Sequence, residues 1–224
     1  LNRFSTMSSR ILITGATRGI GRACAEQFAA AGWAVTAVAR KDSDLYTMAA
    51  HWRDEGWPTL QTVVADLSTE AGIMQVPLLS YDVILLNAGV YVPGGLLTAV
   101  EDVFGDVFAL NVRANHLLAR RLVPAMVKRK EGHLVVIGST GTDHWKAHMT
   151  AYVASKYALR GLFLGWEVEL EESGVLATLV APGATLTSSW AGETPPKDIL
   201  LPETVAEKVW DVVAQRVRGR VLVV

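Results

Sequence analysis

Short apolar segments alternate with longer, helix-length segments along almost the whole chain, and this alternation constrains the possible folds most strongly. Most of the short segments are continuously apolar, as expected for strands that helices cover on both faces. Strands joined by helices form right-handed crossovers and a parallel sheet. We therefore predict an α/β fold, a doubly wound parallel sheet of about seven strands, at residues 10–14, 34–39, 61–65, 83–86, 133–137, 176–180 and 220–224.

The intervals between these strands are long enough for helices, among them residues 19–31, 101–129 and 152–172. No linker, repeat or low-complexity stretch interrupts residues 10–224, which we predict to form a single domain for cofactor binding and catalysis. Residues 1–9 are expected to be a disordered or artificially added amino terminus.

The composition limits the partners and the compartment of the protein. Of 224 residues, 50% are hydrophobic and 19% are charged, and the formal net charge is −1. This balance provides no field that would attract nucleic acid or an anionic membrane, so neither is expected as a partner. The single cysteine, Cys24, excludes an intramolecular disulfide and a multi-cysteine metal site. Since no run approaches the roughly 20 apolar residues that span a bilayer, we expect a cytoplasmic protein.

A glycine-rich turn follows the first predicted strand. Thr14-Gly15-Ala16-Thr17-Arg18-Gly19-Ile20-Gly21 has the spacing Gly-x-x-x-Gly-x-Gly and leads into a predicted helix. Glycines let the backbone approach a ligand closely, and the amino terminus of a helix favours an anion. A tight strand-to-helix connection could use the same glycines, but the position after the first strand of an α/β chain favours a dinucleotide pyrophosphate.

The end of the second predicted strand indicates which dinucleotide binds. NAD-selective sites usually place a carboxylate there to hold the ribose 2′-hydroxyl. This chain has Ala39, Arg40 and Lys41 instead. A carboxylate would repel a 2′-phosphate, whereas Arg40 can bind one through two parallel hydrogen bonds, and Arg18 adds a second cation. The alternative is that Arg40 and Lys41 form only a solvated loop. We predict NADP(H) as the cofactor.

A tyrosine and a lysine stand four residues apart at the start of a predicted helix. Tyr152 and Lys156 should therefore lie on one helix face. A free tyrosine has a pKa of about 10, and a neighbouring ammonium favours the phenolate and lowers that pKa, which would make Tyr152 a usable general acid and base. Ser139 follows the strand predicted at residues 133–137, at the edge where parallel sheets bind ligands.

Several elements of the chain occur in the order found in short-chain dehydrogenases/reductases. They are Thr14–Gly21, Asn87-Ala88-Gly89, Asn111, Ser139, Tyr152-x-x-x-Lys156 and Pro182-Gly183. The chain resembles the short, single-domain branch of this family over nearly its whole length. The resemblance implies a Rossmann fold and an oxidoreductase that transfers hydride between NADP(H) and a carbonyl or alcohol carbon.

The resemblance also implies a role for each matching residue. Ser139 would hydrogen-bond the substrate oxygen, Tyr152 would exchange a proton with it, and Lys156 would hold the nicotinamide ribose. Asn111 would hold a water that links Lys156 to solvent. Further cofactor contacts would come from Asp66 and Leu67 at the adenine, from Asn87, Ala88 and Gly89 at the cofactor floor, and from Pro182, Gly183 and Thr187 at the nicotinamide.

Some of these residues have a structural alternative. Asn87 could be a turn residue, Asn111 a polar group that bonds nearby backbone, and Ser139 a strand-end cap. Asp66 could cap the following helix. These alternatives are not independent, and it is hard to make all of them true together.

The chain departs from the family pattern at two places. Leu86 stands where the family has a further Asn, and the sequence ends at Val224 without the glycine-containing tail of many members. The second departure favours a homodimer, with a tetramer as the alternative. The contact is expected on the helices that carry Asn111 and Tyr152, where a group of apolar side chains either exceeds what one sheet face needs or completes the core: Leu117, Leu118, Leu162, Phe163 and Trp166.

Loops near the catalytic segments are expected to contact the substrate. The irregular stretch 187–201 is predicted to be a lid or binding loop. His144 and His148 stand four residues apart, but the Glu of the metalloprotease pattern is missing and no cysteine is near, so no metal site is predicted. The candidate substrate contacts are Tyr91, Val92, Trp145 and Trp190.

Three functions compete. The first is an NADP(H)-dependent carbonyl reductase or alcohol dehydrogenase, with a 3-oxoacyl-thioester reductase as one form. The second is a non-catalytic NADP(H)-binding redox sensor, which would have no chemical use for Ser139, Tyr152 and Lys156. The third is a methyltransferase, whose sites usually carry an acid where Ala39 and Arg40 stand.

Overall fold

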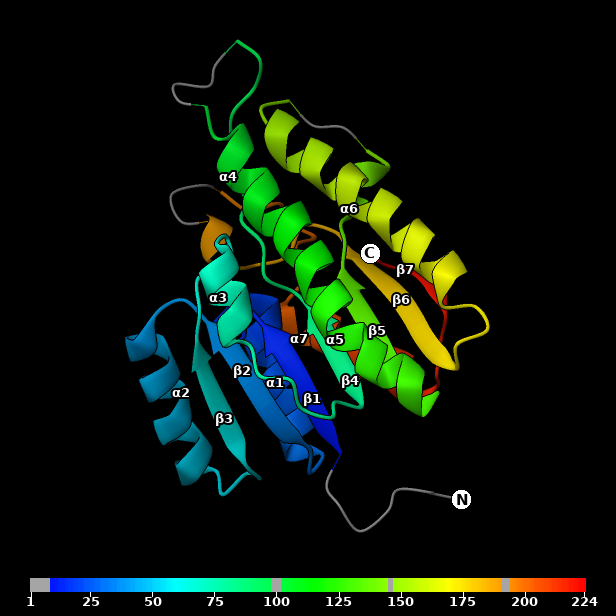
Figure 1. Cartoon of the computed structure of the whole chain (residues 1–224). Coiled ribbons are helices and arrows are strands. Elements are labelled where there is room, and N and C mark those ends of the chain that lie inside the picture. Colours follow the sequence, from blue (N-terminus) through cyan, green and yellow to red (C-terminus); the bar gives the residue numbers. More distant parts are fainter. Residues whose placement is uncertain (1–8, 98–101, 145–146, 191–193) are drawn as a thin grey trace.

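The computed structural model describes residues 9–97, 102–144, 147–190 and 194–224. Its strands are β1 (Arg10–Thr14), β2 (Ala34–Ala39), β3 (Leu60–Val64), β4 (Val83–Leu86), β5 (Gly132–Ile137), β6 (Val175–Pro182) and β7 (Gly219–Val223). They form one seven-stranded parallel sheet in the order β3-β2-β1-β4-β5-β6-β7 (Figure 1). The predicted doubly wound Rossmann fold is confirmed. Apart from Ser9, the predicted amino-terminal segment 1–9 lies outside the described residues.

All seven predicted strands are present, and β1, β2 and β4 have the predicted bounds. The expectation of burial on both faces holds for the central strands but not at the margins. β3 has mainly exposed or partly buried residues, and β7 is buried only at Val223. Both are edge strands, which pair with a neighbour on one side only. A short apolar segment therefore does not reveal whether its strand lies at the centre or at an edge.

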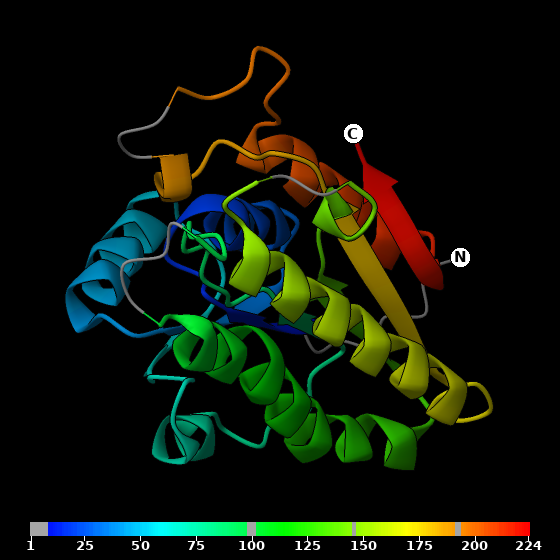
Figure 2. The same cartoon turned by 90° about the horizontal axis from the view of Figure 1, so that it is seen from above.

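Helices cover both faces of the sheet. They are α1 (Gly19–Ala30), α2 (Asp42–Asp54), α3 (Glu70–Gln75), α4 (Phe104–Phe108), α5 (Asn115–Arg129), α6 (Thr150–Glu169) and α7 (Pro202–Ala214). The side chains of α3, α5 and α6 join one core cluster, and those of α1, α2 and α7 join a second cluster on the opposite face. Figure 2 shows α5 and α6 on one side of the sheet and α1 and α7 on the other. Cys24 is buried in the second cluster.

The helix predicted at residues 101–129 is not a regular α-helix. A six-residue π-helix, Ala109–Ala114, separates α4 from α5. Such wider turns occur frequently at functional sites, and this one contains Asn111. An apolar pattern with helical spacing predicts the helix, but it does not reveal one extra residue in a turn.

Three of the five apolar residues predicted at a dimer contact complete the core instead. Leu118, Phe163 and Trp166 are buried in the cluster beneath α5 and α6, and Leu117 and Leu162 pack against that cluster while partly exposed. For those three residues the alternative holds, since they complete the core.

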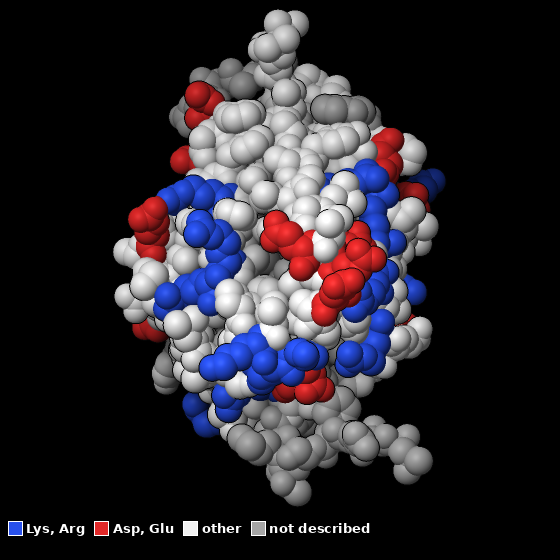
Figure 3. All heavy atoms as spheres, turned by 45° about the vertical axis from the view of Figure 1, so that its right-hand side comes forward, with Lys and Arg blue, Asp and Glu red and all other residues white. Residues whose placement is uncertain are grey.

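One face of the molecule carries charges of both signs. On the face shown in Figure 3, groups of basic side chains lie around a cluster of acidic ones, and the upper part of this face is largely uncharged. This distribution agrees with a net charge of −1. Among the helices of the described chain, none has both the length and the apolar character that crossing a membrane would require.

Candidate active site

The strand order reverses between β1 and β4, which are neighbours in the sheet. In open parallel sheets, ligands bind outside the carboxyl ends of the strands at such a point. The glycine-rich turn follows β1 here, and Asn87 follows β4. Ser139 and Pro182 lie at the carboxyl ends of β5 and β6. Predicted site residues from four strands therefore meet along one edge of the sheet.

Two glycines in the turn are required by the geometry. Gly19 has a φ of +53°, and an added Cβ would lie 2.9 Å from Cγ2 of Thr187. At Gly21 an added Cβ would overlap the carbonyl oxygen of Gly15. Neither position has room for a side chain, as expected for a turn that cradles phosphate. Thr187, predicted at the nicotinamide end, lies directly against this turn.

Thr14 and Asn87 join the glycine turn to the end of β4. The Thr14 hydroxyl oxygen accepts hydrogen bonds from the amides of Asn87 and Ala88, both at 2.9 Å. Nδ2 of Asn87 donates to the carbonyl oxygens of Thr14 and Gly15 at 2.9 and 3.1 Å. Asn87 is therefore more than a turn residue, since its side chain fixes the backbone of the predicted phosphate cradle.

Two arginines lie at the predicted adenosine end. The amides of Gly15 and Ala16 donate to the carbonyl oxygen of Val38 at 2.8 and 3.2 Å, which brings the glycine turn beside the end of β2. Arg18 and Arg40 are both exposed. In the part of the chain that the structure describes, neither arginine takes part in a salt bridge. Both guanidinium groups are exposed, and Arg40 is near enough to Asp66 to help lower the pKa of its carboxyl group.

Asp66 lies after β3, where the resemblance places a contact with adenine. Its Oδ1 accepts hydrogen bonds from the amide and the hydroxyl of Ser68, at 3.0 and 2.7 Å, and these bonds lower the pKa of the carboxyl group. The alternative, that Asp66 caps the following helix, is wrong, because the cap is Thr69, whose hydroxyl oxygen accepts from the amide of Gly72 at 3.0 Å. Leu67 is buried in the core, so a contact with adenine would involve its main chain.

Tyr152 lies in the first turn of α6 and interacts with Ser139. Burial raises the pKa of the Tyr152 phenol, a hydrogen bond with Ser139 opposes that shift, and Tyr91 adds to it. The rings of Tyr91 and Tyr152 pack edge to face, with centroids 5.3 Å apart and planes at 85°. The Ser139 oxygen accepts from the amide of Gly141 at 3.0 Å, so its own hydrogen can serve Tyr152 or a substrate oxygen.

Lys156 shares a face of α6 with Tyr152, as predicted, but its electrostatic effect differs from the prediction. Its Nζ donates to the carbonyl oxygen of Ile137 at 3.0 Å and lies 5.8 Å from the centroid of the Tyr152 ring. Desolvation lowers the pKa of the buried ammonium to about 8. The pKa of Tyr152 is raised rather than lowered, because burial of the phenol is the largest influence on it.

Asn111 is fully buried, and its side chain forms hydrogen bonds with other residues of the chain. Oδ1 accepts from the amide of Val90 at 2.8 Å, and Nδ2 donates to the Val90 carbonyl and to the Ser155 hydroxyl at 2.9 and 3.0 Å. Ser155 in turn donates to the carbonyl oxygen of Tyr152 at 2.6 Å. Asn111 thus bonds nearby backbone, as the alternative interpretation proposed. The predicted water stays a prediction, and it could bind only by donating to an oxygen of Asn111.

Other residues predicted to contact the cofactor or the substrate lie along the same edge of the sheet, and one of them lies outside the described residues. Pro182 ends β6, and its carbonyl accepts from the Thr140 hydroxyl at 3.4 Å. Trp190 is half-buried, and its indole Nε1 donates to the carbonyl of Thr185 in its own loop at 3.0 Å. Trp145 lies outside the described residues. Among the residues that are described, no group of three or more His, Cys, Asp or Glu side chains is placed to hold a metal ion.

Sequence reasoning overlooked two polar residues behind the site. Ser155 joins Asn111 to Tyr152, and Asn115 donates from Nδ2 to the carbonyl oxygen of Asn111 at 2.8 Å. Both are buried. Each stands three or four residues from a predicted catalytic residue, so helical spacing could have indicated them.

A glycine cradle at the switch point of a parallel sheet, with Ser, Tyr and Lys along the same edge, defines a class of nucleotide-binding folds with acid–base groups. The family model described as short chain dehydrogenase matches residues 9–198. The chain therefore belongs to the short-chain dehydrogenase/reductase family.

Individual relatives agree with this assignment. A short chain dehydrogenase of Pseudocercospora fijiensis is 32% identical over 181 residues, which are 77% of this chain and 58% of that protein. The 3-oxoacyl-[acyl-carrier-protein] reductase FabG of Haemophilus influenzae is 27% identical over 178 residues, 79% of this chain and 74% of that protein. The solved short-chain dehydrogenase from Sphingobium yanoikuyae in complex with NADPH has a TM-score of 0.88 at 28% identity, covering 96% of this chain and 87% of that one. The chain spans somewhat over half the length of the first curated relatives that it matches.

Proposed function

We propose that this chain catalyses NADP(H)-dependent hydride transfer at a carbonyl or alcohol carbon of a small-molecule substrate. The observation that carries the proposal is the convergence of Ser139, Tyr152 and Lys156 on the edge of the sheet that also holds the glycine cradle. Membership of the short-chain dehydrogenase family supports the reaction class.

The residues of the cradle fit NADP(H). Gly19 and Gly21 let the turn pack against Thr187 and the Gly15 carbonyl, which keeps the turn at the amino terminus of α1, where a pyrophosphate would bind. Arg18 and Arg40 are exposed and would bind the 2′-phosphate, and the position after β2 carries no carboxylate that would repel it. The NADPH bound by the similar Sphingobium yanoikuyae protein supports the same choice. Bound NADPH would supply the hydride.

Tyr152, Ser139 and Lys156 would carry out the proton transfer. The Tyr152 phenol, whose ordinary pKa of about 10 is raised further by burial, is protonated near neutrality, as a general acid must be. The Ser139 hydroxyl would hold the substrate oxygen beside it. As Tyr152 releases its proton, the buried ammonium of Lys156, 5.8 Å from the ring centroid, would stabilise the phenolate.

Within this reaction class, the site suits substrates that carry a carbonyl group beside the acid–base residues. A ketone or an aldehyde satisfies the acid–base groups, and a 3-oxoacyl thioester is one candidate, supported by the similarity to the FabG reductase of Haemophilus influenzae. Tyr91 is well placed to contact the substrate because its ring packs against that of Tyr152. The competing function, a non-catalytic redox sensor, would bind NADPH without consuming it.

We further propose that two copies of the chain associate through α5 and α6. Leu164 and Val168 on α6 are 53% and 73% exposed, and a second copy could cover them. Sedimentation of the wild-type chain and of a Val168→Glu variant would test this. A monomeric wild type would refute the dimer.

The reaction is tested by Tyr152→Phe. NADPH consumption is measured with a panel of ketones, aldehydes and 3-oxoacyl thioesters, alongside NADPH affinity by fluorescence titration. We expect turnover to fall by about 10² to 10⁴ with cofactor affinity preserved, because only the proton path is removed. Tyr157→Phe, on the same helix but 40% exposed, is the matched control and should keep its activity. Undiminished turnover in Tyr152→Phe would assign the chemistry elsewhere, and NADPH binding without any consumption by the wild type would favour the sensor.

The cofactor preference is tested by Arg40→Asp. The ratio of kcat/KM for NADPH to that for NADH should fall about tenfold or more, since a charge-assisted hydrogen bond is lost and a repulsion introduced. Arg53→Asp, an exposed arginine at the end of α2, controls for the change in net charge. NADPH selectivity that survives Arg40→Asp would contradict the assignment.

A further inference from the structure

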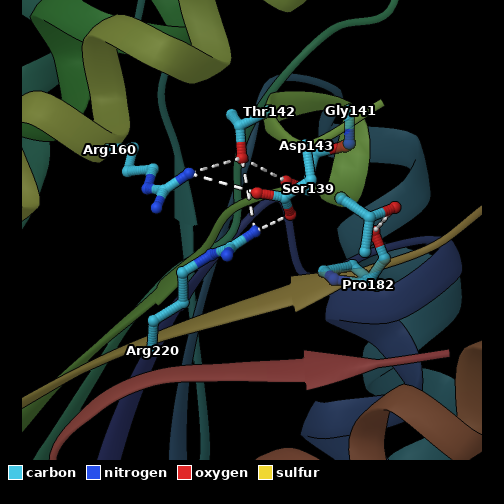
Figure 4. A network of polar contacts seen from close by, with 8 residues as sticks. Ser139, Gly141, Thr142, Asp143, Arg160, Pro182 and Arg220 are labelled. Carbon is cyan, nitrogen blue, oxygen red and sulfur yellow. Dashed lines mark hydrogen bonds and ion pairs between the residues drawn. The ribbon is translucent and has the colours of Figure 1, made fainter. Parts of the chain in front are cut away.

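The turn that carries Ser139 is held by charged side chains from two distant elements (Figure 4). After Ser139 come a short 3-10 helix, Thr140–Thr142, and then Asp143. Oδ1 of Asp143 accepts from Nη1 of Arg160 at 3.2 Å, and its Oδ2 pairs with Nη2 of Arg220. We name Asp143, Arg160 and Arg220 the Asp143 clamp.

The clamp reaches the main chain of Ser139 through one buried side chain. The Thr142 hydroxyl donates to the carbonyl oxygen of Ser139 at 3.1 Å. The same hydroxyl oxygen lies 3.5 Å from Nη1 of Arg160 and 3.4 Å from Nη2 of Arg220, and it accepts from both. Figure 4 shows both guanidinium groups directed at Thr142 and Asp143. Removal of either arginine would therefore loosen the residue that fixes the Ser139 backbone.

Arg160 belongs to the helix that carries the acid–base pair. Tyr152, Lys156 and Arg160 follow one another at intervals of four and so form one stripe along α6. This stripe contacts the segment after β5 at three points: Tyr152 at the Ser139 side chain, Lys156 at the carbonyl of Ile137, and Arg160 at Asp143. The clamp thus extends the contact that aligns the tyrosine with the serine.

Arg220 adds a second anchor from the last strand, β7. The side chains of Arg160, Asp143 and Arg220 are 33%, 28% and 22% exposed, whereas the surface pair Arg113 and Glu70 is 48% and 75% exposed. Partly buried charges are screened less by water and salt than exposed ones. The hydrogen bond from Arg220 is also the largest influence that lowers the pKa of the Asp143 carboxyl group. The carboxylate therefore stays ionised and paired near neutrality.

We propose that Asp143, Arg160 and Arg220 are positioning residues, which set where the Ser139 hydroxyl stands relative to the Tyr152 phenol and so control the rate of proton transfer. The inference rests on the proposed function and adds to it. Small displacements of a reacting group lower the rate strongly, whereas the glycine cradle on β1 is held by other contacts. A weakened clamp should therefore lower kcat and leave the affinity for NADPH unchanged.

The test compares Asp143→Asn, Arg220→Met and the control Arg218→Met in the full chain. Asp143→Asn keeps the shape of the side chain and removes its charge. Arg218 lies two residues from Arg220, but its Nη1 donates to the carbonyl of Glu171 at 3.4 Å, away from the Ser139 turn. With NADPH and a reducible ketone, we expect kcat to fall about ten- to hundredfold in the first two variants and less than twofold in Arg218→Met. NADPH affinity should stay within twofold in all three.

A double variant separates positioning from general damage. In a Ser139→Ala background, adding Asp143→Asn should change kcat less than twofold, because the clamp acts through the serine that is already removed. Losses that multiply in the double variant would show that Asp143 acts independently of Ser139 and would overturn the proposal. A kcat for Asp143→Asn within twofold of the wild-type value would overturn it as well.

Amide hydrogen exchange gives a readout that does not require turnover. The amides of Gly141 and Asp143 are bonded within the turn, to the Ser139 hydroxyl and the Thr140 carbonyl. Exchange in this turn should accelerate at least tenfold in Asp143→Asn and Arg220→Met, and not in Arg218→Met. If Arg220→Met does not fold, Arg220→Lys replaces it. If the wild type consumes no NADPH with any of the carbonyl compounds, the proposed function is refuted. If amide exchange is unchanged in the clamp variants, the clamp itself is refuted.

Discussion

Acidification should destabilise the protein through His133, a buried histidine on β5. The side chain is 4% exposed, and its Nε2 lies 2.8 Å from the hydroxyl oxygen of Thr178 on β6. Thr178 donates its own hydrogen to the carbonyl of Val217, so Nε2 must carry the hydrogen of the neutral ring. Burial, the largest cause, lowers the pKa of His133 from 6.5 to about 4.

The direction and size of the effect follow from the difference in pKa between the two states. The unfolded chain, with an ordinary histidine pKa, binds a proton more readily than the folded chain. The free energy of unfolding should therefore fall as the pH drops below 6.5, and the loss should be complete below the folded-state pKa of about 4. The full difference corresponds to about 3 kcal/mol, of which about 2 kcal/mol is lost between pH 7 and pH 5.

Urea unfolding of the wild type and of His133→Gln measures this contribution. Glutamine can still donate to Thr178 but does not titrate in this range, so other titrating groups cancel in the difference between the two proteins. The wild-type free energy of unfolding, minus that of the variant, should decrease by about 2 kcal/mol from pH 7 to pH 5. A difference that is the same at both pH values would refute the assignment of a neutral, buried His133.

Three further predictions concern the cofactor edge and its core. Gly21→Ala should abolish measurable NADPH binding in a fluorescence titration, because the added methyl would displace the carbonyl of Gly15, and retained affinity would contradict this geometry. Asn87→Ala should raise the Kd for NADPH about tenfold while the fold remains intact, since two bonds to the glycine turn are lost, and an unchanged Kd would show that Asn87 is dispensable. Cys24 should resist a thiol reagent in the native protein and react in urea, because burial raises its pKa to about 12; rapid native reaction would place it at the surface.

The fold could be predicted because its signals are local. Short, mostly apolar runs identified every strand, and helix-length intervals identified the crossovers, so the parallel topology followed from short-range patterns. The exposure of β3 and β7 could not be predicted, since it depends on strand order, which no single segment records. The π-helix at Ala109–Ala114 was missed for a similar reason. The side chain of Asn111 in this turn bonds Val90 and Ser155, which lie in distant segments, and Asn115 donates to the Asn111 carbonyl within the turn.

In the candidate site, too, short motifs predict some features, and others depend on the folded structure. Short motifs indicated the glycine turn, Ser139, Tyr152 and Lys156, and the structure brings them to one edge of the sheet. The pKa of Tyr152 was predicted in the wrong direction, because the helical spacing to Lys156 was known but the burial of the phenol was not. The partnership of Asp143 with Arg220 joins residues 77 positions apart, and only the assembled sheet makes them neighbours.

The polar residues that support the site form two groups, and loss of each group should change a different quantity. Asn87 holds the glycine turn and lies on the cofactor side, whereas Asn111 and the Asp143 clamp hold the segments that carry Tyr152 and Ser139. Loss of a support on the first side leaves the acid–base groups aligned, so the change should appear in cofactor affinity. Loss of a support on the second side leaves the cradle intact, so the change should appear in kcat. The strands that separate these supports belong to one continuous sheet, so damage that spread through the whole fold would change both cofactor affinity and kcat. A variant that changes only one of the two quantities therefore shows a loss of positioning rather than a loss of stability.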